Sequence, residues 1–226
     1  YSTVETIRLT GAFDTESKIH EIFGGNTLNV KERLTYHVND NLRFIARGGY
    51  FARVSNRANY DDHYHDYSGG LRSVWQIDAT QNLELSYSYD QYDKARYTGG
   101  ERTHDHDYSN RQHIAHGLYT KFWGANGLTV GADCMYDFLS TYQFAGNNSH
   151  AQTTLDAFVQ FDYNPLSWLN IVASVRDDYF SESDNNALTA RFATMFKLKP
   201  LSIRASYAGG FRAPTLKEMY MCFDMA

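Results

Sequence analysis

The sequence predicts an all-β fold, an antiparallel up-and-down meander of about 10–12 long strands that forms part of a transmembrane β-barrel. Three observations predict it. Apolar and polar residues alternate with a period of two, short turns alternate with longer polar loops, and aromatic residues gather near both kinds of connection. A barrel wall needs this pattern, because one face of each strand meets lipid and the other meets a wet lumen.

The composition excludes several other classes of protein. The 226 residues include 18 Tyr and 14 Phe but no apolar run of roughly 18 residues, so no transmembrane helix is expected. Three prolines and 15% aromatic residues argue against disorder. Two cysteines are too few for a disulfide framework, and a net charge of -5 argues against a nucleic-acid partner.

Period-two alternation marks the strands. In residues 83–90, leucines and tyrosines alternate with a glutamate, two serines and an aspartate. We expect about ten such strands from Leu28 to Phe211 and one more around Thr3–Phe13, each of about 10–12 residues, the length that a tilted membrane-spanning strand needs. The clearest alternation falls at 42–51, 83–90, 154–163, 169–176 and 202–207.

The connections are predicted to differ at the two ends of the strands. Short turns rich in Asn, Asp, Gly and Pro are expected at 39–41, 79–82, 123–127, 164–168 and 199–200. Longer polar loops are expected at about 54–66, 94–109, 141–151 and 181–186. Short turns on one side and long loops on the other are typical of outer-membrane barrels.

Aromatic residues are predicted to form two girdles at the membrane interfaces. All three tryptophans lie near short turns, whereas several tyrosines lie nearer the long loops. The alternative is that aromatic residues are simply good strand formers. The residues concerned are Trp75, Trp123 and Trp168 at one end, and Tyr50, Tyr67, Tyr89 and Tyr136 at the other.

Charged residues on the polar face are predicted to point into the lumen. In a soluble sandwich the same residues would form the solvent face, but strand length and loop asymmetry favour the barrel. They are Arg43, Arg47, Arg72, Glu84, Asp90, Asp133, Asp156, Asp162 and Arg176.

Two of the predicted long loops carry a His-x-His pattern flanked by aspartates. Imidazole and carboxylate together suit a transition metal or haem iron, and clustered aspartates suit calcium. Alternate spacing in an extended loop puts both imidazoles on one side. The alternative is a pair of solvated polar loops. The predicted ligand-binding residues are His63, His65, His104 and His106, with Asp61, Asp62, Asp66, Asp105 and Asp107 as metal ligands.

The stretch from Ala208 to Tyr220, AGGFRAPTLKEMY, resembles the late-barrel segment of TonB-dependent outer-membrane receptors. Within it, Phe211, Arg212, Ala213 and Pro214 match the "FRAP box" of haem receptors. The resemblance implies a 22-stranded barrel plugged by an N-terminal domain. Residues 1–226 are then expected to be part of the barrel domain, without the plug and the C-terminal strands.

The resemblance also implies a function. A receptor of this kind imports a scarce nutrient such as haem, an iron–siderophore complex or vitamin B12 across the bacterial outer membrane. Its partners are outer-membrane lipid, a small-molecule metal chelate and a TonB-type energy-transducing complex that acts through the plug. We expect no intrinsic cofactor, only loop-bound calcium or the iron or cobalt of the ligand.

Other functions remain open from the sequence alone. The alternatives are a passive structural or adhesin barrel without a plug and a soluble carbohydrate-binding β-sandwich. The chain contains no catalytic motif that would predict an enzyme. Arg212 is expected near the outer rim, either as a contact between the strand end and a neighbouring loop or as a direct ligand contact.

Overall fold

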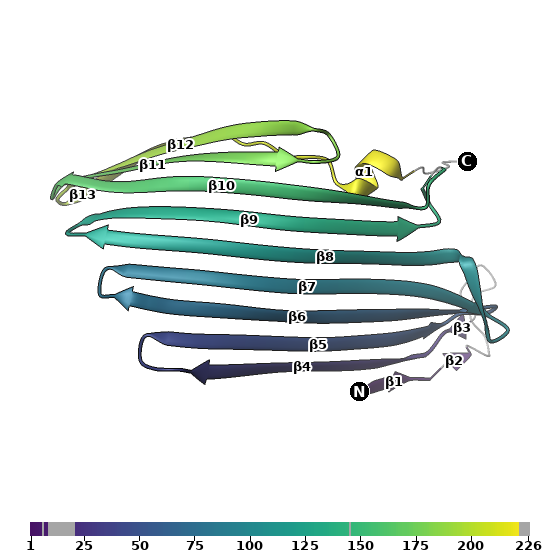
Figure 1. Cartoon of the computed structure of the whole chain (residues 1–226). Coiled ribbons are helices and arrows are strands. Elements are labelled where there is room, and N and C mark those ends of the chain that lie inside the picture. Colours follow the sequence, from purple (N-terminus) through teal and green to yellow (C-terminus); the bar gives the residue numbers. More distant parts are fainter. Residues whose placement is uncertain (6, 9–20, 145, 222–226) are drawn as a thin grey trace.

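The computed structural model describes residues 1–5, 7–8, 21–144 and 146–221. Within these ranges the chain forms an antiparallel sheet of eleven strands, in which β1 pairs with β4 and each strand from β4 to β12 pairs with the next along the chain (Figure 1). The strands in order are β1 (Ser2–Val4), β4 (Gly25–His37), β5 (Leu42–Asn56), β6 (Asp61–Asp78), β7 (Gln81–Thr98), β8 (Glu101–Trp123), β9 (Asn126–Thr141), β10 (Ser149–Leu166), β11 (Leu169–Phe180), β12 (Asn185–Leu198) and β13 (Leu201–Ala208). Two further short strands, β2 (Ile7–Arg8) and β3 (Glu21–Ile22), pair with each other, and a helix, α1 (Leu216–Tyr220), follows β13.

The meander predicted from alternation is confirmed. Strands β4 to β13 occupy the region where about ten strands were expected. The additional strand predicted around Thr3–Phe13 corresponds in part to β1 and β2, and residues 9–13 of that prediction lie outside the described residues. Among the described residues, no helix is long and apolar enough to cross a membrane.

The predicted strand length was wrong for much of the sheet. The strands β6, β7 and β10 each have 18 residues and β8 has 23, well beyond the 10–12 expected. The short turns fall where they were predicted, but most of the loops predicted at 54–66 and 94–109 is strand. The link between β7 and β8 is a two-residue turn at Gly99 and Gly100, whose φ angles of 63° and 88° suit glycine. Polar side chains do not interrupt a strand, because the hydrogen bonds of a sheet join the backbone groups of neighbouring strands.

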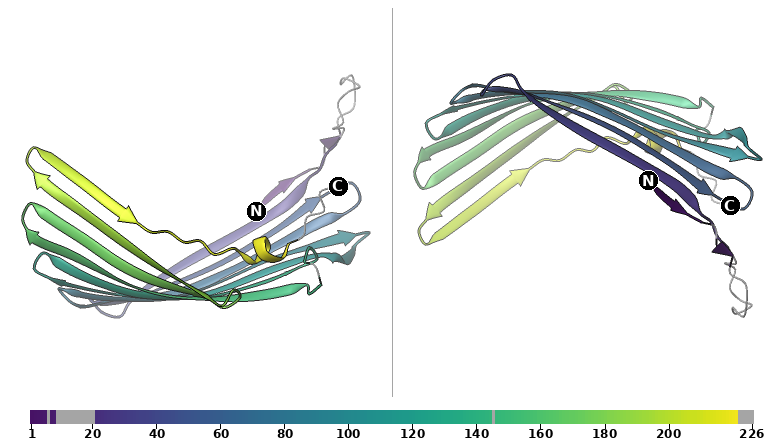
Figure 2. Two further views of the ribbon diagram at one scale, coloured as in Figure 1. Left: turned by 90° about the horizontal axis from the view of Figure 1, so that it is seen from above. Right: turned by 90° about the horizontal axis from the view of Figure 1, so that it is seen from below.

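The sheet curves into an open trough with links of mostly two residues at one end and, apart from the turn at Gly99 and Gly100, longer connections of four or more residues at the other (Figures 1 and 2). Helix α1 lies on the concave side of the trough, at the end of the longer connections. We call this end the mouth.

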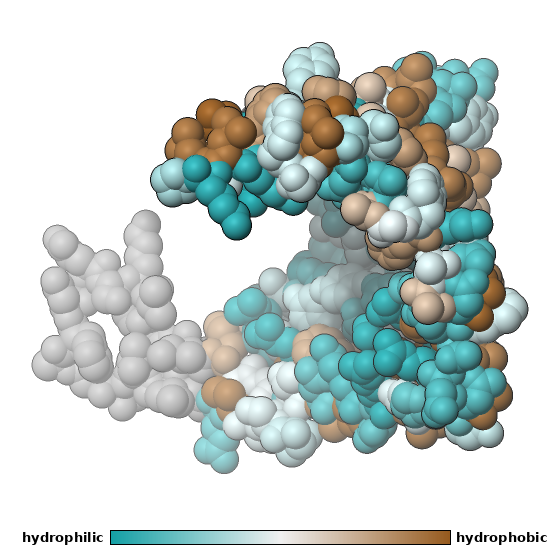
Figure 3. All heavy atoms as spheres, turned by 90° about the vertical axis from the view of Figure 1, so that its left-hand side faces the viewer, coloured by the Kyte–Doolittle hydropathy of each residue, from teal (hydrophilic) through white to brown (hydrophobic). Residues whose placement is uncertain are grey.

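Strand register sorts the side chains onto two faces. Residues paired directly across antiparallel strands share a face. Leu71, Tyr87, Ala115, Cys134 and Leu155 form one such row on the convex face. Hydrophobic residues cover much of the outside and hydrophilic residues line the hollow (Figure 3).

The nine charged residues predicted to face the lumen share the concave face. Register links Arg43 to Glu84 through Val74, and links Asp133 directly to Asp156. Two ion pairs join members of this set, Arg72 with Glu84 at 2.5 Å and Arg176 with Asp156 at 3.1 Å. The tryptophans Trp75, Trp123 and Trp168 lie at the short-turn end, with 42–45% of their surface exposed, as a girdle requires.

Candidate ligand-binding site

Beyond the length that crosses a membrane, the strands β5 to β8 continue as a wall at the mouth. Their cross-strand partners there are Arg53 with Tyr64, Tyr64 with Lys94, and Lys94 with Tyr108. By register these residues face the concave side, as do the charged residues deeper in the wall. Together with neighbours described below they form what we call the mouth cluster: Arg53, Asp62, Tyr64, Tyr92, Lys94, Arg96, Tyr108 and Lys217.

Three tyrosine rings run side by side across the mouth cluster. The ring centroids of Tyr64 and Tyr92 are 6.3 Å apart, and those of Tyr92 and Tyr108 are 5.9 Å apart. Two ammonium groups sit over the ends of this row, Lys94 at 5.6 Å from the Tyr64 centroid and Lys217 at 5.0 Å from the Tyr108 centroid. Both distances lie within the range of a cation–π interaction.

The buried carboxylate of Asp62 binds two of the cluster's cations, Arg96 and Lys94. Asp62, which is 4% exposed, accepts a hydrogen bond from Nε of Arg96 at 3.0 Å and lies 3.3 Å from Nζ of Lys94. The Arg96 guanidinium also stacks 3.8 Å from the Tyr60 ring centroid. Burial alone would raise the pKa of Asp62, but the hydrogen bonds and charges of Arg96 and Lys94 outweigh it and hold the pKa below its ordinary value.

This arrangement suits an anionic, partly aromatic ligand. Tyrosine offers a flat apolar face and a hydroxyl, and Arg and Lys supply charge-assisted hydrogen bonds. The four cations of the mouth cluster outnumber its single carboxylate, although Asp66 faces the same side one step deeper. The cluster therefore favours anions over cations.

The structure separates the predicted histidines. His63 and His65 lie in β6, not in a loop, and their register puts them on the convex face with Tyr67 and Leu71. There the Nδ1 atom of His65 is 3.0 Å from the Tyr50 hydroxyl, and the His63 ring lies 4.3 Å from that of Tyr97. The prediction that both imidazoles share a side is confirmed, but that side faces away from the trough.

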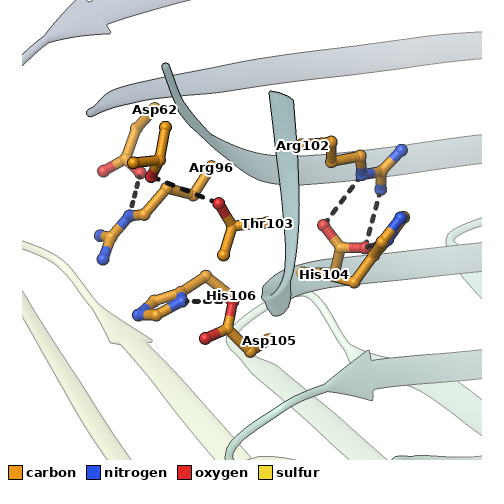
Figure 4. Close-up of polar contacts among 9 residues, drawn as sticks. Asp62, Arg96, Arg102, Thr103, His104, Asp105 and His106 are labelled. Atoms are coloured by element: carbon orange, nitrogen blue, oxygen red, sulfur yellow. Dashed lines mark hydrogen bonds and ion pairs between the residues drawn. The ribbon is translucent and has the colours of Figure 1, made fainter. Parts of the chain in front are cut away.

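The other two histidines lie in β8, at a register shift opposite Lys94 and Arg96. Figure 4 shows His104 beside Arg102, and His106 beside Asp105 on the side of Asp62 and Arg96. The Nδ1 atom of His104 and a terminal nitrogen of Arg102 lie 3.0 Å and 3.1 Å from the carboxylate of Asp107. The His106 ring packs 5.0 Å from that of Tyr142, in the link between β9 and β10.

The predicted metal-binding carboxylates are similarly divided. Asp61 shares the convex face, whereas Asp62 and Asp66 face the trough. Among the described residues, no group of three or more His, Cys, Asp or Glu side chains is placed to hold a metal ion. Metal binding by these residues stays a prediction.

Arg212 lies in the irregular segment between β13 and α1, and its contact with Glu218 of α1 places it near the mouth. Its side chain is 75% exposed and its Nη2 atom donates a hydrogen bond of 2.5 Å to the Glu218 carboxylate. The ring of Phe211, the first residue of the four-residue motif, lies 5.6 Å from that of Phe180. In the structure Arg212 thus contacts the helix that follows it.

Comparison with known proteins agrees with the barrel-type sheet described above. A family model described as "TonB dependent receptor-like, beta-barrel" matches residues 7–224. The solved siderophore receptor PirA from Pseudomonas aeruginosa superposes with a TM-score of 0.74 at 13% identity, covering 85% of this chain and 35% of that one. A ferric enterobactin receptor (PfeA) mutant from the same organism gives 0.70 at 13% identity, covering 92% and 36%.

A third solved structure, PirA from Acinetobacter baumannii, gives a TM-score of 0.63 at 13% identity, covering 85% of this chain and 34% of that one. The chain thus spans about a third of the length of the solved receptors that it matches. A search of curated proteins finds no match.

Proposed function

Because the chain belongs to the TonB-dependent receptor β-barrel family, we propose that it is the part of an outer-membrane receptor that binds an iron–siderophore complex and forms one wall of its import path. Barrels of this family lie in the outer membrane of Gram-negative bacteria, and so does this chain.

The observation that carries the proposal is the row of tyrosines flanked by cations at the mouth. Many siderophores wrap Fe(III) in anionic oxygen ligands, and some of these ligands are aromatic. Such a chelate matches the rings of Tyr64, Tyr92 and Tyr108 and the charges of Arg53 and Lys217. One solved structure similar to this chain is a ferric enterobactin receptor mutant in complex with enterobactin, which is consistent with this ligand class.

The polar trough suits passage of such a ligand. Its wall carries Arg43 and Arg47, and no carboxylate forms an ion pair with either among the described residues. An anion leaving the mouth would therefore meet these two cations deeper in the wall, alongside the carboxylates of Glu84 and Asp90 on the same face. The energy for release would come from a TonB-type complex acting on a plug, as it does in this family.

The experiment is a ligand comparison with the receptor that contains this chain. Purified receptor in detergent is titrated with ferric enterobactin, haem and cyanocobalamin, and quenching of intrinsic fluorescence reports binding. Radioactive iron uptake by a receptor-deficient strain carrying the gene reports transport. We expect saturable binding of the ferric chelate and uptake that stops when TonB is deleted.

Two results would contradict the proposal. Binding of haem or cobalamin with no binding of the ferric chelate would assign another ligand. If that ligand is haem, weaker haem binding in His106→Ala would point to an iron-ligating imidazole. Uptake of none of the three, together with a passive conductance in planar bilayers, would support a structural barrel.

A further inference from the structure

The segment that carries the four-residue motif does not continue the sheet. After β13 ends at Ala208, the chain runs along the concave side and forms α1 near β8 to β10 (Figure 2). The last described residue, Met221, forms an isolated bridge with Phe144 in the link between β9 and β10. We call residues 209–221 the strap.

The strap is held by the most tightly packed apolar contact among the described residues. Leu216 is 2% exposed and packs with Leu139 of β9 and with Phe144, which are 1% and 5% exposed. Tyr220 stacks on His150 of β10, with ring centroids 3.6 Å apart and planes 2° from parallel. The Tyr220 hydroxyl also donates to the carboxylate of Glu182, in the link between β11 and β12.

A helix of five residues is not stable by itself, so its ends must be fixed by other contacts. Thr215 and Glu218 form a capping box. The Glu218 amide donates to the Thr215 hydroxyl at 3.3 Å, and the Thr215 amide donates to Oε2 of Glu218 at 2.9 Å. The other oxygen, Oε1, accepts the hydrogen bond from Arg212. Arg212 thus fixes the carboxylate that caps the helix.

We propose that Arg212 is a positioning residue, which acts through Glu218 to hold α1 against the wall and so keeps Lys217 over Tyr108 in the mouth cluster. The ligand part of this inference rests on the proposed function, whereas the contact between Arg212 and α1 does not. A direct contact between Arg212 and the ligand is the competing role.

The positioning role and direct ligand contact predict different results when Arg212 and Glu218 are changed separately and together. Glutamine at the third helical position still serves a capping box, so Glu218→Gln removes the ion pair and keeps the cap. If Arg212 acts through Glu218, then Arg212→Ala, Glu218→Gln and the double variant have the same effect. Arg212→Lys keeps the charge and restores most of the function. Arg57→Ala changes an exposed arginine in the link between β5 and β6 and serves as the matched control.

The experiment measures hydrogen exchange and ligand binding in the same receptor variants. Mass spectrometry follows exchange of the α1 amides, among them Met219 and Met221, which donate within the helix. Because the ion pair is solvent-exposed, we expect α1 amide exchange to rise about two- to fivefold in Arg212→Ala and Glu218→Gln. Affinity for ferric enterobactin falls equally in the two variants, by a factor no larger than the rise in exchange, and neither value changes in Arg57→Ala.

Three results would distinguish failure of the positioning role from failure of the proposed ligand. Unchanged exchange in Arg212→Ala would overturn the positioning role. Reduced binding in Arg212→Ala with normal binding in Glu218→Gln would instead assign Arg212 to direct ligand contact. Wild-type receptor that binds no ferric chelate, but whose α1 exchange still depends on Arg212 and Glu218, would refute the proposed ligand and leave the positioning contact in place.

Discussion

The two faces of the outer half of β6 carry different chemistry on adjacent residues. Tyr64 and Asp66 point into the trough, where the Tyr64 ring lies 6.3 Å from that of Tyr92 in the tyrosine row. His63, His65 and Tyr67 point outward, where they make ring contacts with other aromatic side chains. One residue along a strand therefore decides whether a side chain faces the trough or the outside of the sheet.

The outward-facing rings of β6 and its neighbours resemble a continuation of the aromatic girdle at the membrane interface. Tyr50 with His65 and Tyr87 with His113 form hydroxyl–imidazole contacts at 3.0 Å and 2.7 Å on the convex face. Amphipathic rings with a polar tip suit the height of lipid headgroups. The inward set instead combines aromatic faces with uncovered charge, which suits a soluble anion.

The largest effect is expected for Leu216→Ala, which removes the side chain that anchors the strap on the inner wall. Loss of a buried leucine costs about 2–5 kcal/mol, so α1 should dissociate from the wall and its amides should exchange as in an open peptide. The control is Leu71→Ala on the convex face, where the side chain is 52% exposed and lipid can fill the space. Equal α1 exchange in both variants would contradict the packing described.

Tyr92→Ala should weaken binding of ferric enterobactin about tenfold, because it removes the middle ring of the tyrosine row. Tyr89→Ala, on the opposite face of the same strand, should leave the affinity unchanged. Fluorescence titration of both purified variants measures the difference. Equal losses would mean that the two faces do not differ in ligand contact.

The mouth cluster should tolerate moderate acid. The pKa of Asp62 is lowered, so its contribution to stability is present above the ordinary carboxyl value and is lost as pH falls through the lowered one. The part of the thermal midpoint that depends on Asp62 should therefore stay level from about pH 7 to 5 and decline below about 4. Asp62→Asn should reduce that decline, and an identical pH profile in the variant would count against the ion-paired carboxylate.

The smallest effect is expected for the double variant His63→Ala, His65→Ala. Both side chains face outward, so affinity for the ferric chelate should change less than about twofold, which is less than about 0.4 kcal/mol. The same titration measures it. A tenfold loss would restore the role first predicted for these histidines.

The sequence predicts the sheet well, because alternation and turn residues are local signals. Residues 83–90 and the turn at 39–41 show a strand and a turn directly, and the structure contains both. The loop predictions failed at 54–66 because polar residues there continue the ladder. Counting back in twos from Trp75 through Leu71 and Tyr67 reaches His65, so its outward direction was available from the sequence.

The mouth cluster is harder to predict. Its tyrosines come from three strands, and their contacts depend on cross-strand register that a single sequence does not specify. The pattern Thr215-x-x-Glu218 does signal a helix start. The contact of that helix with Leu139, 77 positions before Leu216, depends on how the chain folds back over the sheet.

The most direct test compares two adjacent positions of β6 in the receptor that contains this chain. In a background where Cys134 and Cys222 are changed to Ser, Asp66→Cys and His65→Cys are labelled separately with a hydrophilic maleimide, with and without ferric enterobactin. We predict that the ferric chelate slows labelling at position 66 and not at position 65. Protection at position 65 alone, or equal protection at both, would contradict the assignment of the concave face to the ligand.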